Sequence, residues 1–262
     1  NQVSKTPMLY GINKAGVGVG TDGYAAFNAD LNQRIGDTSA IRINMMAREE
    51  DSARSNPVSG ATPHIQRAGF APSISFGLGT EHELTASYYY LTTNDRPDYG
   101  VPFNATTKRP NEVYAMANAY WGVNGSFDNS DTNIATLNYL YRIAPDTQWR
   151  TVMRGANYKR SYWAVAPQGG SPTQYSLASQ AKTRETDTDN FAIQSDYSTT
   201  FTTFGMKNEL LAGVEYLYED NKRWSLRNLG TATRPKYQSG QFAGAPSTYS
   251  GNSYSAFVQD AL

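Results

Sequence analysis

The segment YAAFNADLNQRI, residues 24–35, decides the fold class because apolar and polar side chains alternate along it. Its apolar positions are Ala25, Phe27, Ala29 and Leu31, and its polar positions are Asn28, Asp30, Asn32 and Arg34. A period of two residues is the pattern of a β-strand with one apolar face. Residues 41–48 repeat this pattern with one exception, Met46, and a short turn at 36–39 separates the two segments. The sequence therefore predicts a β-hairpin here.

The same alternation recurs along the chain in segments of about 10 residues, which is the length that a tilted membrane-spanning strand needs. With weaker candidates at 8–19 and 253–262 there are ten such segments; the other six lie at 69–78, 84–90, 135–142, 149–154, 190–197 and 209–219. We expect an all-β, antiparallel, up-and-down transmembrane barrel segment, with no helix longer than two turns. The residues expected on its outer face are Phe27, Leu31, Ile43, Ile74, Leu137, Ile193, Leu210 and Val214.

The connections between these segments alternate in length. Short connections fall at 36–39, 79–82, 144–147 and roughly 199–205, and long ones fall at 49–63, 93–131, 160–186 and 220–252. The first connection, 20–23, is short. Short turns at one rim and long loops at the other are typical of outer-membrane barrels. A soluble β-sandwich also alternates, but loops this long are uncommon in compact soluble domains, and the tyrosines at segment ends suit the aromatic girdle of a membrane barrel.

Composition excludes several classes of function. The chain has no cysteine, which removes disulfides, thiolate metal sites and cysteine nucleophiles, and its 23 basic residues equal its 23 acidic residues, so no net field recruits nucleic acid. The G-x-G-x-x-G match at 18–23 runs into a strand pattern and is interpreted as a glycine turn. The two histidines, His64 and His82, lie near opposite ends of one hairpin and cannot share a metal. We therefore expect no catalytic residue, no metal ligand and no enzyme activity.

Charged residues on the polar faces predict a wet or plug-filled interior. Six arginines and three glutamates are expected to face inward and to act as mutual counter-ions: Arg34, Arg42, Arg48, Arg142, Arg150, Arg154, Glu209, Glu215 and Glu219.

Several strings in the chain resemble the TonB-dependent siderophore receptors of the outer membrane, and the catecholate branch of that family most closely. They are NQVSKTP at 1–7, FAPSISFGLGT at 70–80, DRPDYGVP at 95–102, DTNIATL at 131–137, LLAGVEY at 210–216 and YSAFVQD at 254–260. The resemblance implies that residues 1–7 are the end of the plug or its linker, and that residues 8–262 are a partial barrel. We expect a fragment with about ten of the roughly 22 strands of such transporters. The family's plug, TonB-contacting box and aromatic-terminated last strand are not in this sequence.

The function implied by the resemblance is reception and transport of ferric siderophores, energy-coupled through TonB, in the Gram-negative outer membrane. The expected partners are a ferric siderophore as the transported ligand, outer-membrane lipid, and the TonB complex through the plug region, with no cofactor. The candidate ligand-binding residues offer charges and flat rings that would hold an anionic aromatic chelate. They are Arg96, Asp98, Tyr99, Tyr114, Tyr120, Trp121, Tyr158, Tyr162 and Trp163.

Each of those rings has a simpler interpretation as a girdle or loop-packing residue. Two other classes of protein also remain open at this stage: a complete small outer-membrane barrel that acts as a porin or adhesin, and a soluble β-sandwich that binds carbohydrate. A plug encoded upstream would favour the receptor over both. Solubility without detergent would favour the sandwich.

Overall fold

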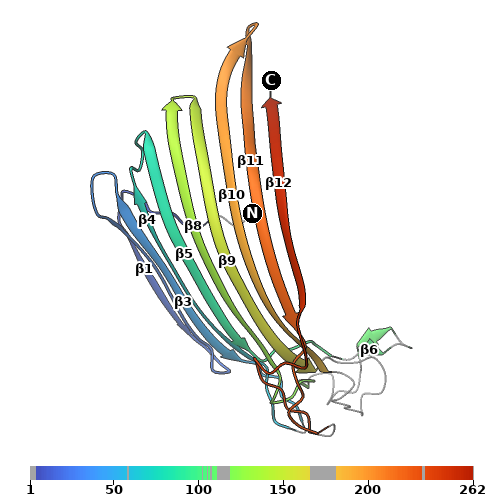
Figure 1. The fold of residues 1–262 in the computed structure, drawn as a ribbon. Coiled ribbons are helices and arrows are strands. Elements are labelled where there is room, and N and C mark those ends of the chain that lie inside the picture. The colour runs from blue at the N-terminus through green and yellow to red at the C-terminus, as the bar shows by residue number, and fades with distance from the viewer. Residues whose placement is uncertain are drawn as a thin grey trace.

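A computed structural model describes residues 4–57, 59–101, 103–104, 106, 108–110, 119–165, 181–231 and 234–261. Ten antiparallel strands form one sheet in which each strand pairs with its neighbours along the chain (Figure 1). They are β1 (Ile12–Val19), β2 (Ala25–Arg34), β3 (Ala40–Asp51), β4 (His64–Phe76), β5 (His82–Asp95), β8 (Phe127–Ala144), β9 (Thr147–Val165), β10 (Ala181–Thr203), β11 (Met206–Trp224) and β12 (Ser247–Ala261). A two-stranded ribbon, β6 (Phe103–Asn104) with β7 (Arg109–Pro110), stands apart from the sheet.

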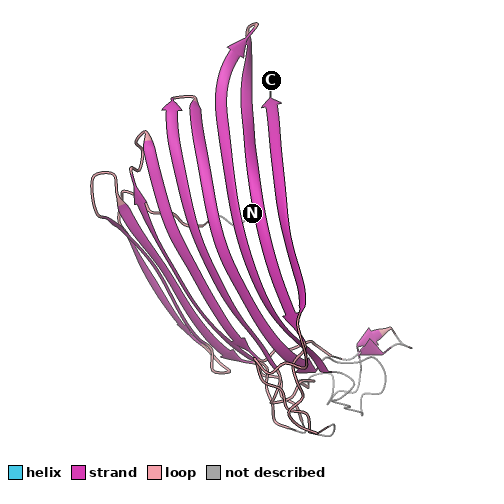
Figure 2. Cartoon of the chain, in the orientation of Figure 1, coloured by secondary structure: helices cyan, strands magenta, loops and turns pink. Residues whose placement is uncertain are grey.

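The sheet is a curved wall, as Figure 2 shows, and the described residues contain strands, turns and loops but no helix. In that part of the chain no helix is long and apolar enough to cross a membrane. The up-and-down order and the strand number agree with the sequence prediction. The 20–24 connection is a turn between β1 and β2, with Asp22 and Gly23 both at positive φ, so the glycine-turn interpretation of this motif is confirmed.

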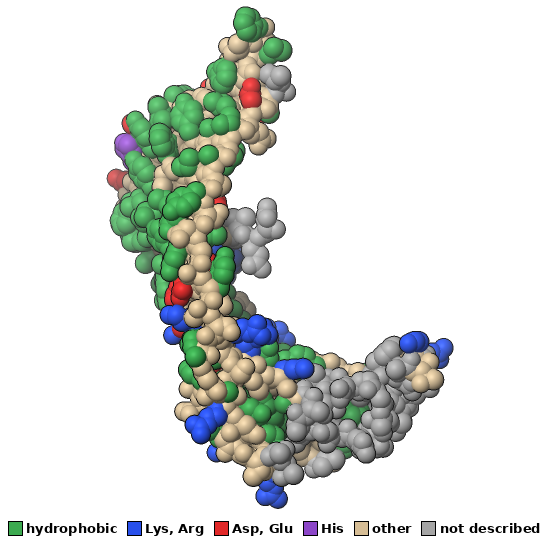
Figure 3. All heavy atoms as spheres, turned by 45° about the vertical axis from the view of Figure 1, so that its right-hand side comes forward, with side chains coloured by type: hydrophobic (Ala, Val, Ile, Leu, Met, Phe, Trp, Pro, Cys, Tyr) green, Lys and Arg blue, Asp and Glu red, His purple; other side chains and the backbone are tan. Residues whose placement is uncertain are grey.

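The pairing register shows which residues share a face, because directly paired residues of neighbouring strands point the same way. One row of such pairs crosses eight strands through Ile41, Ile74, Ala86, Leu137, Met153, Ile193, Tyr216 and Tyr254. This row lies on the convex side, where hydrophobic side chains gather in Figure 3. The predicted outer-face residues share this face, and Val214 is 57% exposed on it. The concave face is polar.

The two rims differ as the sequence predicts. Short turns at 35–39, 77–81, 145–146 and 204–205 join the strands at the upper rim of Figure 1, and longer connections lie at the lower rim. Phe204 and Gly205 both have positive φ, which closes the β10–β11 hairpin in two residues. The upper rim is therefore made of tight hairpins, and only the lower rim has loops large enough to carry a binding site.

The strands are longer than predicted, which corrects the expected loops at 93–131, 160–186 and 220–252. β10 has 23 residues and β9 has 19, so parts of all three stretches are strand. Twenty-three residues span about 75 Å, far more than the apolar band of about 25 Å. Beyond the band both faces can be polar, as in the run from Lys182 to Asp189. The backbone hydrogen bonds between strands continue there, but the alternation of apolar side chains that identifies a strand in the sequence does not.

Candidate functional site

A hollow of ≈ 420 Å³ lies on the inner face near the lower rim. It is lined by Tyr99, Arg160, Tyr162, Ala164, Lys182, Arg184 and Thr186. Six of these residues come from β9 and β10, where every second residue points inward and the register places Tyr162 opposite Arg184. Tyr99 comes from the loop that follows β5. The hollow therefore joins a rigid two-strand floor to one side chain from a loop.

The floor of the hollow carries more positive than negative charge. Arg160 forms a bidentate ion pair with Asp128, with Nε–Oδ1 and Nη2–Oδ2 distances of 2.8 and 2.6 Å. Its guanidinium carbon also lies 5.1 Å from the centroid of the Tyr162 ring. Within the described residues neither Lys182 nor Arg184 has a carboxylate partner, and Nε of Arg184 is buried without a hydrogen bond. Two uncompensated cations beside tyrosine rings can bind an anionic ligand that is itself aromatic.

Tyr99 presents a neutral ring to this charged floor. Its side chain is 47% exposed, and burial of its phenol together with the negative charge of Asp128 raises the pKa of Tyr99 above the usual value. At neutral pH the hydroxyl therefore keeps its proton and can donate a hydrogen bond. Of the rings predicted in this loop and seen in the structure, Tyr99 is the one that lines the hollow.

Arg96 and Asp98 are tied to the protein rather than to open space. Arg96 exchanges two backbone hydrogen bonds with His64, and its Nη1 donates to the carbonyl of Thr62 at 2.9 Å. Asp98 accepts a hydrogen bond from Nη1 of Arg54 at 2.5 Å and another from the amide of Gly100 at 2.8 Å. These contacts hold the backbone on either side of Tyr99, and so they fix where its ring lies.

Tyr120 and Trp121 are buried, with 1% and 5% of their surfaces exposed. The Tyr120 hydroxyl donates to the carbonyl of Pro97 at 3.1 Å, which ties the second half of the β5–β8 connection to the loop that carries Tyr99. A side chain at Gly122 would have its Cβ 1.9 Å from this hydroxyl, so only glycine fits beside the ring. Both rings thus pack the loops together. Tyr114 lies outside the described residues.

The three predicted β9 residues do not share one face: Tyr158 and Tyr162 point inward and Trp163 points outward. Tyr158 faces inward and accepts a hydrogen bond from Nη2 of Arg154 at 2.6 Å. Trp163 is only 3% exposed and stacks on Tyr237 at 5.2 Å between ring centroids, on the outer side, where the loop between β11 and β12 covers it. The structure therefore brings Tyr99 and Tyr162 to the hollow and places Tyr158 further along the same face.

Three cations of the hollow, Arg160, Lys182 and Arg184, were not among the predicted site residues. They lie in the stretch 160–186 that the sequence indicated as loop, so their shared face could not be read from it. One signal was available: Tyr158, Arg160 and Tyr162 continue the period of two beyond the end of the apolar pattern.

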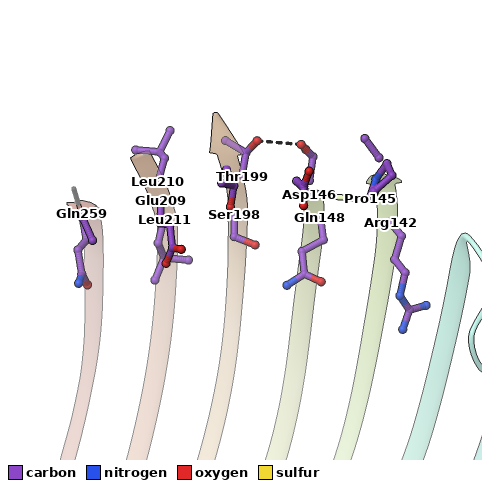
Figure 4. Close-up of a pocket in the computed structure, with 14 residues that line it drawn as sticks. Arg142, Pro145, Asp146, Gln148, Ser198, Thr199, Glu209, Leu210, Leu211 and Gln259 are labelled. Carbon is purple, nitrogen blue, oxygen red and sulfur yellow. Dashed lines mark hydrogen bonds between the residues drawn. The ribbon is translucent and has the colours of Figure 1, made fainter. Parts of the chain in front are cut away.

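A second hollow, of ≈ 550 Å³, lies at the opposite rim and is shown in Figure 4. Its lining comes from strand ends and tight turns, and it includes Arg142, Asp146, Gln148, Ser198, Glu209 and Gln259. Charges of both signs line it, and none of its lining residues is aromatic. It lacks the aromatic surface that would hold a flat ligand, and so we place the candidate ligand site at the lower rim.

The inward charges are not paired as predicted. Arg42 binds Asp30, Arg142 binds Glu83, and Glu209 binds Lys207, whereas no predicted arginine contacts any of the three predicted glutamates. Arg34 and Arg48 pair with Asp37 and Glu50. The expected counter-ion set is therefore wrong. Cross-strand pairing is short-ranged, and the glutamates lie on β11, two strands away from the nearest arginine strand, β9.

Sequence comparison relates the chain to known proteins. No protein-family model matches it. It is 27% identical over 247 residues to the catecholate siderophore receptor Fiu of Escherichia coli O157:H7, and 28% identical over 228 residues to the probable TonB-dependent siderophore receptor PiuA of Acinetobacter baumannii. These matches cover 86% and 82% of the chain. The chain is homologous to siderophore receptors. It spans 32% and 29% of the lengths of these two proteins.

Solved structures agree with this homology. The crystal structure of PiuA from Acinetobacter baumannii superposes with a TM-score of 0.79 at 20% identity, over 98% of this chain and 41% of that chain. The open form of Fiu from Escherichia coli K12 gives 0.78 at 25% identity, over 98% and 42%. The predicted resemblance to siderophore receptors and the predicted fold are confirmed. These relatives are Gram-negative outer-membrane receptors, so the convex apolar face is a lipid-facing barrel wall.

Proposed function

We propose that the chain is the ligand-binding first portion of the barrel of an outer-membrane receptor that captures ferric siderophores of the catecholate class. The hollow at the lower rim is the observation that carries the proposal, because it combines tyrosine rings with two cations, Lys182 and Arg184, that have no carboxylate partner among the described residues. A ferric tris-catecholate is an anion whose surface consists of aromatic rings. Such a ligand offers charge to Arg184 and Lys182 and flat faces to Tyr99 and Tyr162.

The proposal concerns binding and transport, and includes no chemistry on the ligand. The ferric siderophore is cargo rather than a cofactor, and no catalytic or metal-ligating side chain of the chain takes part. Residues 1–7 are proposed to lead from a plug into the barrel at residues 8–262, and the intact receptor is proposed to draw energy through TonB by way of that plug. Nucleic acid has no place in this function.

The predicted residues divide into two roles in this proposal. Tyr99 and Tyr162 face the ligand in the hollow, and Tyr158 lies further along the same inner face. The others hold the surfaces that surround the hollow: Arg96, Asp98, Tyr120, Trp121 and Trp163. Burial supports this division. A ring with 1% of its surface exposed, such as Tyr120, cannot stack on a ligand unless the loops open.

The test is ligand binding by the intact receptor carrying Tyr99→Ala and Tyr162→Ala together. Loss of each stacked ring should cost about 0.5–1.5 kcal/mol beyond its buried area, so the affinity should fall several-fold or more. The probe is the iron(III) complex of 2,3-dihydroxybenzoate, and binding is followed by quenching of receptor fluorescence.

The matched control is Tyr254→Ala, which removes an exposed ring from the outer face of β12. It should leave affinity unchanged. Wild-type affinity in a fully assembled Tyr99→Ala, Tyr162→Ala receptor would remove the hollow from the binding site.

A further inference from the structure

The connection between β11 and β12 lies at the lower rim (Figure 1) and packs against the outer face of the wall. Its described residues are 225–231 and 234–246. Two arms of this connection run side by side, and the amide of Arg227 on the first arm donates to the carbonyl of Gln241 on the second at 2.6 Å. We call these residues the clasp.

Stacked rings fasten the clasp to two strands. Tyr237 stacks on Trp163 of β9 with 5.2 Å between ring centroids, and Phe242 stacks on Trp224 of β11 at 4.8 Å. Both tryptophans point outward, as the pairing register requires. Leu226 of the clasp is 3% exposed and packs in the same cluster as Trp163. The clasp and the wall therefore share a small apolar core on the outside of the barrel.

Hydrogen bonds fasten the clasp to β10, the strand between those two. Oε2 of Glu185 accepts from the amide of Gly240 in the clasp at 2.9 Å and from the hydroxyl of Ser161 on β9 at 2.8 Å. The amide of Leu226 donates to Oγ1 of Thr183 at 3.3 Å. The clasp thus holds β10 by two outward side chains.

The residues that contact the clasp alternate along the chain with residues that line the hollow. Arg184 lies between Thr183 and Glu185, and Tyr162 comes directly before Trp163. Successive side chains of a strand point to opposite faces, so Arg184 and Tyr162 line the hollow on the inner face while their neighbours meet the clasp outside. The clasp and the hollow are therefore on opposite sides of the same short stretch of wall.

This stretch of β10 has little support within the sheet. β11 pairs with β10 only from Glu185 onward, so 181–184 pair with β9 alone. Two strands without a buried face are marginally stable in water. Lys182 and Arg184, the two cations of the hollow without a carboxylate partner among the described residues, both lie in this stretch. Their positions depend on a segment that needs packing from outside the sheet.

We propose that the clasp positions Lys182 and Arg184 for ligand binding from the opposite face of the wall, with Tyr237 and Glu185 as positioning residues; this rests on the proposed function. Neither residue touches the hollow. When the clasp is released, the end of β10 separates from β9 for part of the time, and the two cations leave the hollow with it. The apparent affinity for the ligand falls in proportion to the fraction of receptor that keeps them in place.

The first test measures binding of the radioactive iron(III) complex of 2,3-dihydroxybenzoate to the intact receptor. Tyr237→Ala removes the stacked ring and should weaken binding about fivefold or more. Tyr237→Phe keeps the ring and should bind like the wild type. Leu229→Ala is the matched control, because Leu229 belongs to the clasp but is 42% exposed and lies outside the apolar cluster.

A double-mutant cycle shows whether the clasp acts through the two cations. In a receptor that carries Lys182→Gln with Arg184→Gln, adding Tyr237→Ala should weaken binding by less than about twofold, because the groups that the clasp positions are already gone. In a Tyr99→Ala receptor it should keep its full effect, since Tyr99 comes from the loop after β5. Equal losses in the two backgrounds would overturn the proposal, and so would wild-type affinity in Tyr237→Ala.

Trypsin cleavage after Lys182 and Arg184 tests the position of β10 without a ligand. Cleavage should be about fivefold faster or more in Tyr237→Ala than in the wild type, and unchanged in Tyr237→Phe and Leu229→Ala. Equal cleavage in the wild type and Tyr237→Ala would overturn the proposal. If the wild type fails to bind the iron complex, the proposed function is contradicted, and the cleavage rates still decide whether the clasp holds the strand.

Glu185 gives a second route to the same test if Tyr237→Ala does not assemble. Glu185→Ala removes the acceptor of the Gly240 amide and should weaken binding and speed cleavage in the same way. Glu185→Gln keeps an oxygen at that place and should restore both. Equal behaviour of Glu185→Ala and the wild type would overturn the proposal.

Discussion

Two tyrosines of the lower rim, Tyr99 and Tyr120, occupy opposite environments, although the sequence gives no sign that they differ. Tyr99 lines the hollow, while Tyr120 is buried beneath loops that come from distant parts of the chain. The Tyr120 amide donates to the carbonyl of Ser55, and the Asn56 side chain donates to the carbonyl of Gly122. Burial at this position therefore depends on the β3–β4 connection meeting both halves of the β5–β8 connection, and no local pattern near residue 120 encodes that meeting.

The burial of Tyr120 predicts how the rim responds to alkali. Removal from water raises the pKa of Tyr120 to about 12, against an ordinary value of 10.0. Because its pKa is raised by folding, the Tyr120 hydroxyl keeps its proton to a higher pH in the folded state than in the unfolded state. The contribution of this group to the free energy of unfolding is therefore constant below pH 10 and is lost between pH 10 and about 12. The rim should loosen in that window.

The measurement is a phenolate absorbance titration of the wild type minus that of Tyr120→Phe. The difference curve should show one phenol with a midpoint near 12. A midpoint near 10 would mean that the ring is exposed in solution and that the loops do not cover it.

At the scale of elements, alternation of side chains was sufficient to place the membrane-spanning parts of the strands and their faces. Residues 24–35 and 41–48 became β2 and β3 with Leu31 and Ile43 paired on the outer face, as predicted. The sequence does not reveal the strand extensions, because a strand with water on both faces needs no apolar face. The run Lys182–Asp189 accordingly contains no apolar residue. The cations of the hollow lie in those extensions. Their position depends on a register that only the assembled sheet defines.

The outer face of β11 gives a direct test of this assignment. Val214→Arg should cost about 2–4 kcal/mol if it lies near the membrane midplane, because hydrocarbon cannot solvate a guanidinium. Yield of heat-modifiable receptor in the outer membrane should fall. Glu215→Arg is the control, since it puts the same side chain at the next position, on the wet inner face. Equal yields of the two variants would mean that the faces of β11 are reversed.

At the scale of the whole molecule, the N-terminal segment crosses the concave face and ties itself to the wall. Asp30 binds Lys5 and Arg42, and Nη1 of Arg42 donates to the carbonyl of Thr6 at 2.8 Å. Asn32 is fully buried beneath the segment. Its amide accepts from the nitrogen of Met8 and donates to the carbonyls of Met8 and Tyr10, at 2.9, 2.8 and 2.5 Å. One side chain of β2 therefore satisfies three backbone groups of an irregular segment that has no strand partner.

This arrangement predicts that Asn32→Ala releases the segment from the wall. Three hydrogen bonds are lost and buried backbone groups are left unpaired, at a cost of about 1–3 kcal/mol for such groups. Trypsin should then cut the intact receptor between Lys5 and Thr6 about five times faster or more, since 1 kcal/mol of local opening already gives about that factor. Asn28→Ala changes another inward asparagine of β2 that does not touch the segment, and it should leave cleavage slow. Equal cleavage of both variants would mean that the ion pairs at Asp30, rather than Asn32, hold the N-terminal segment against the barrel.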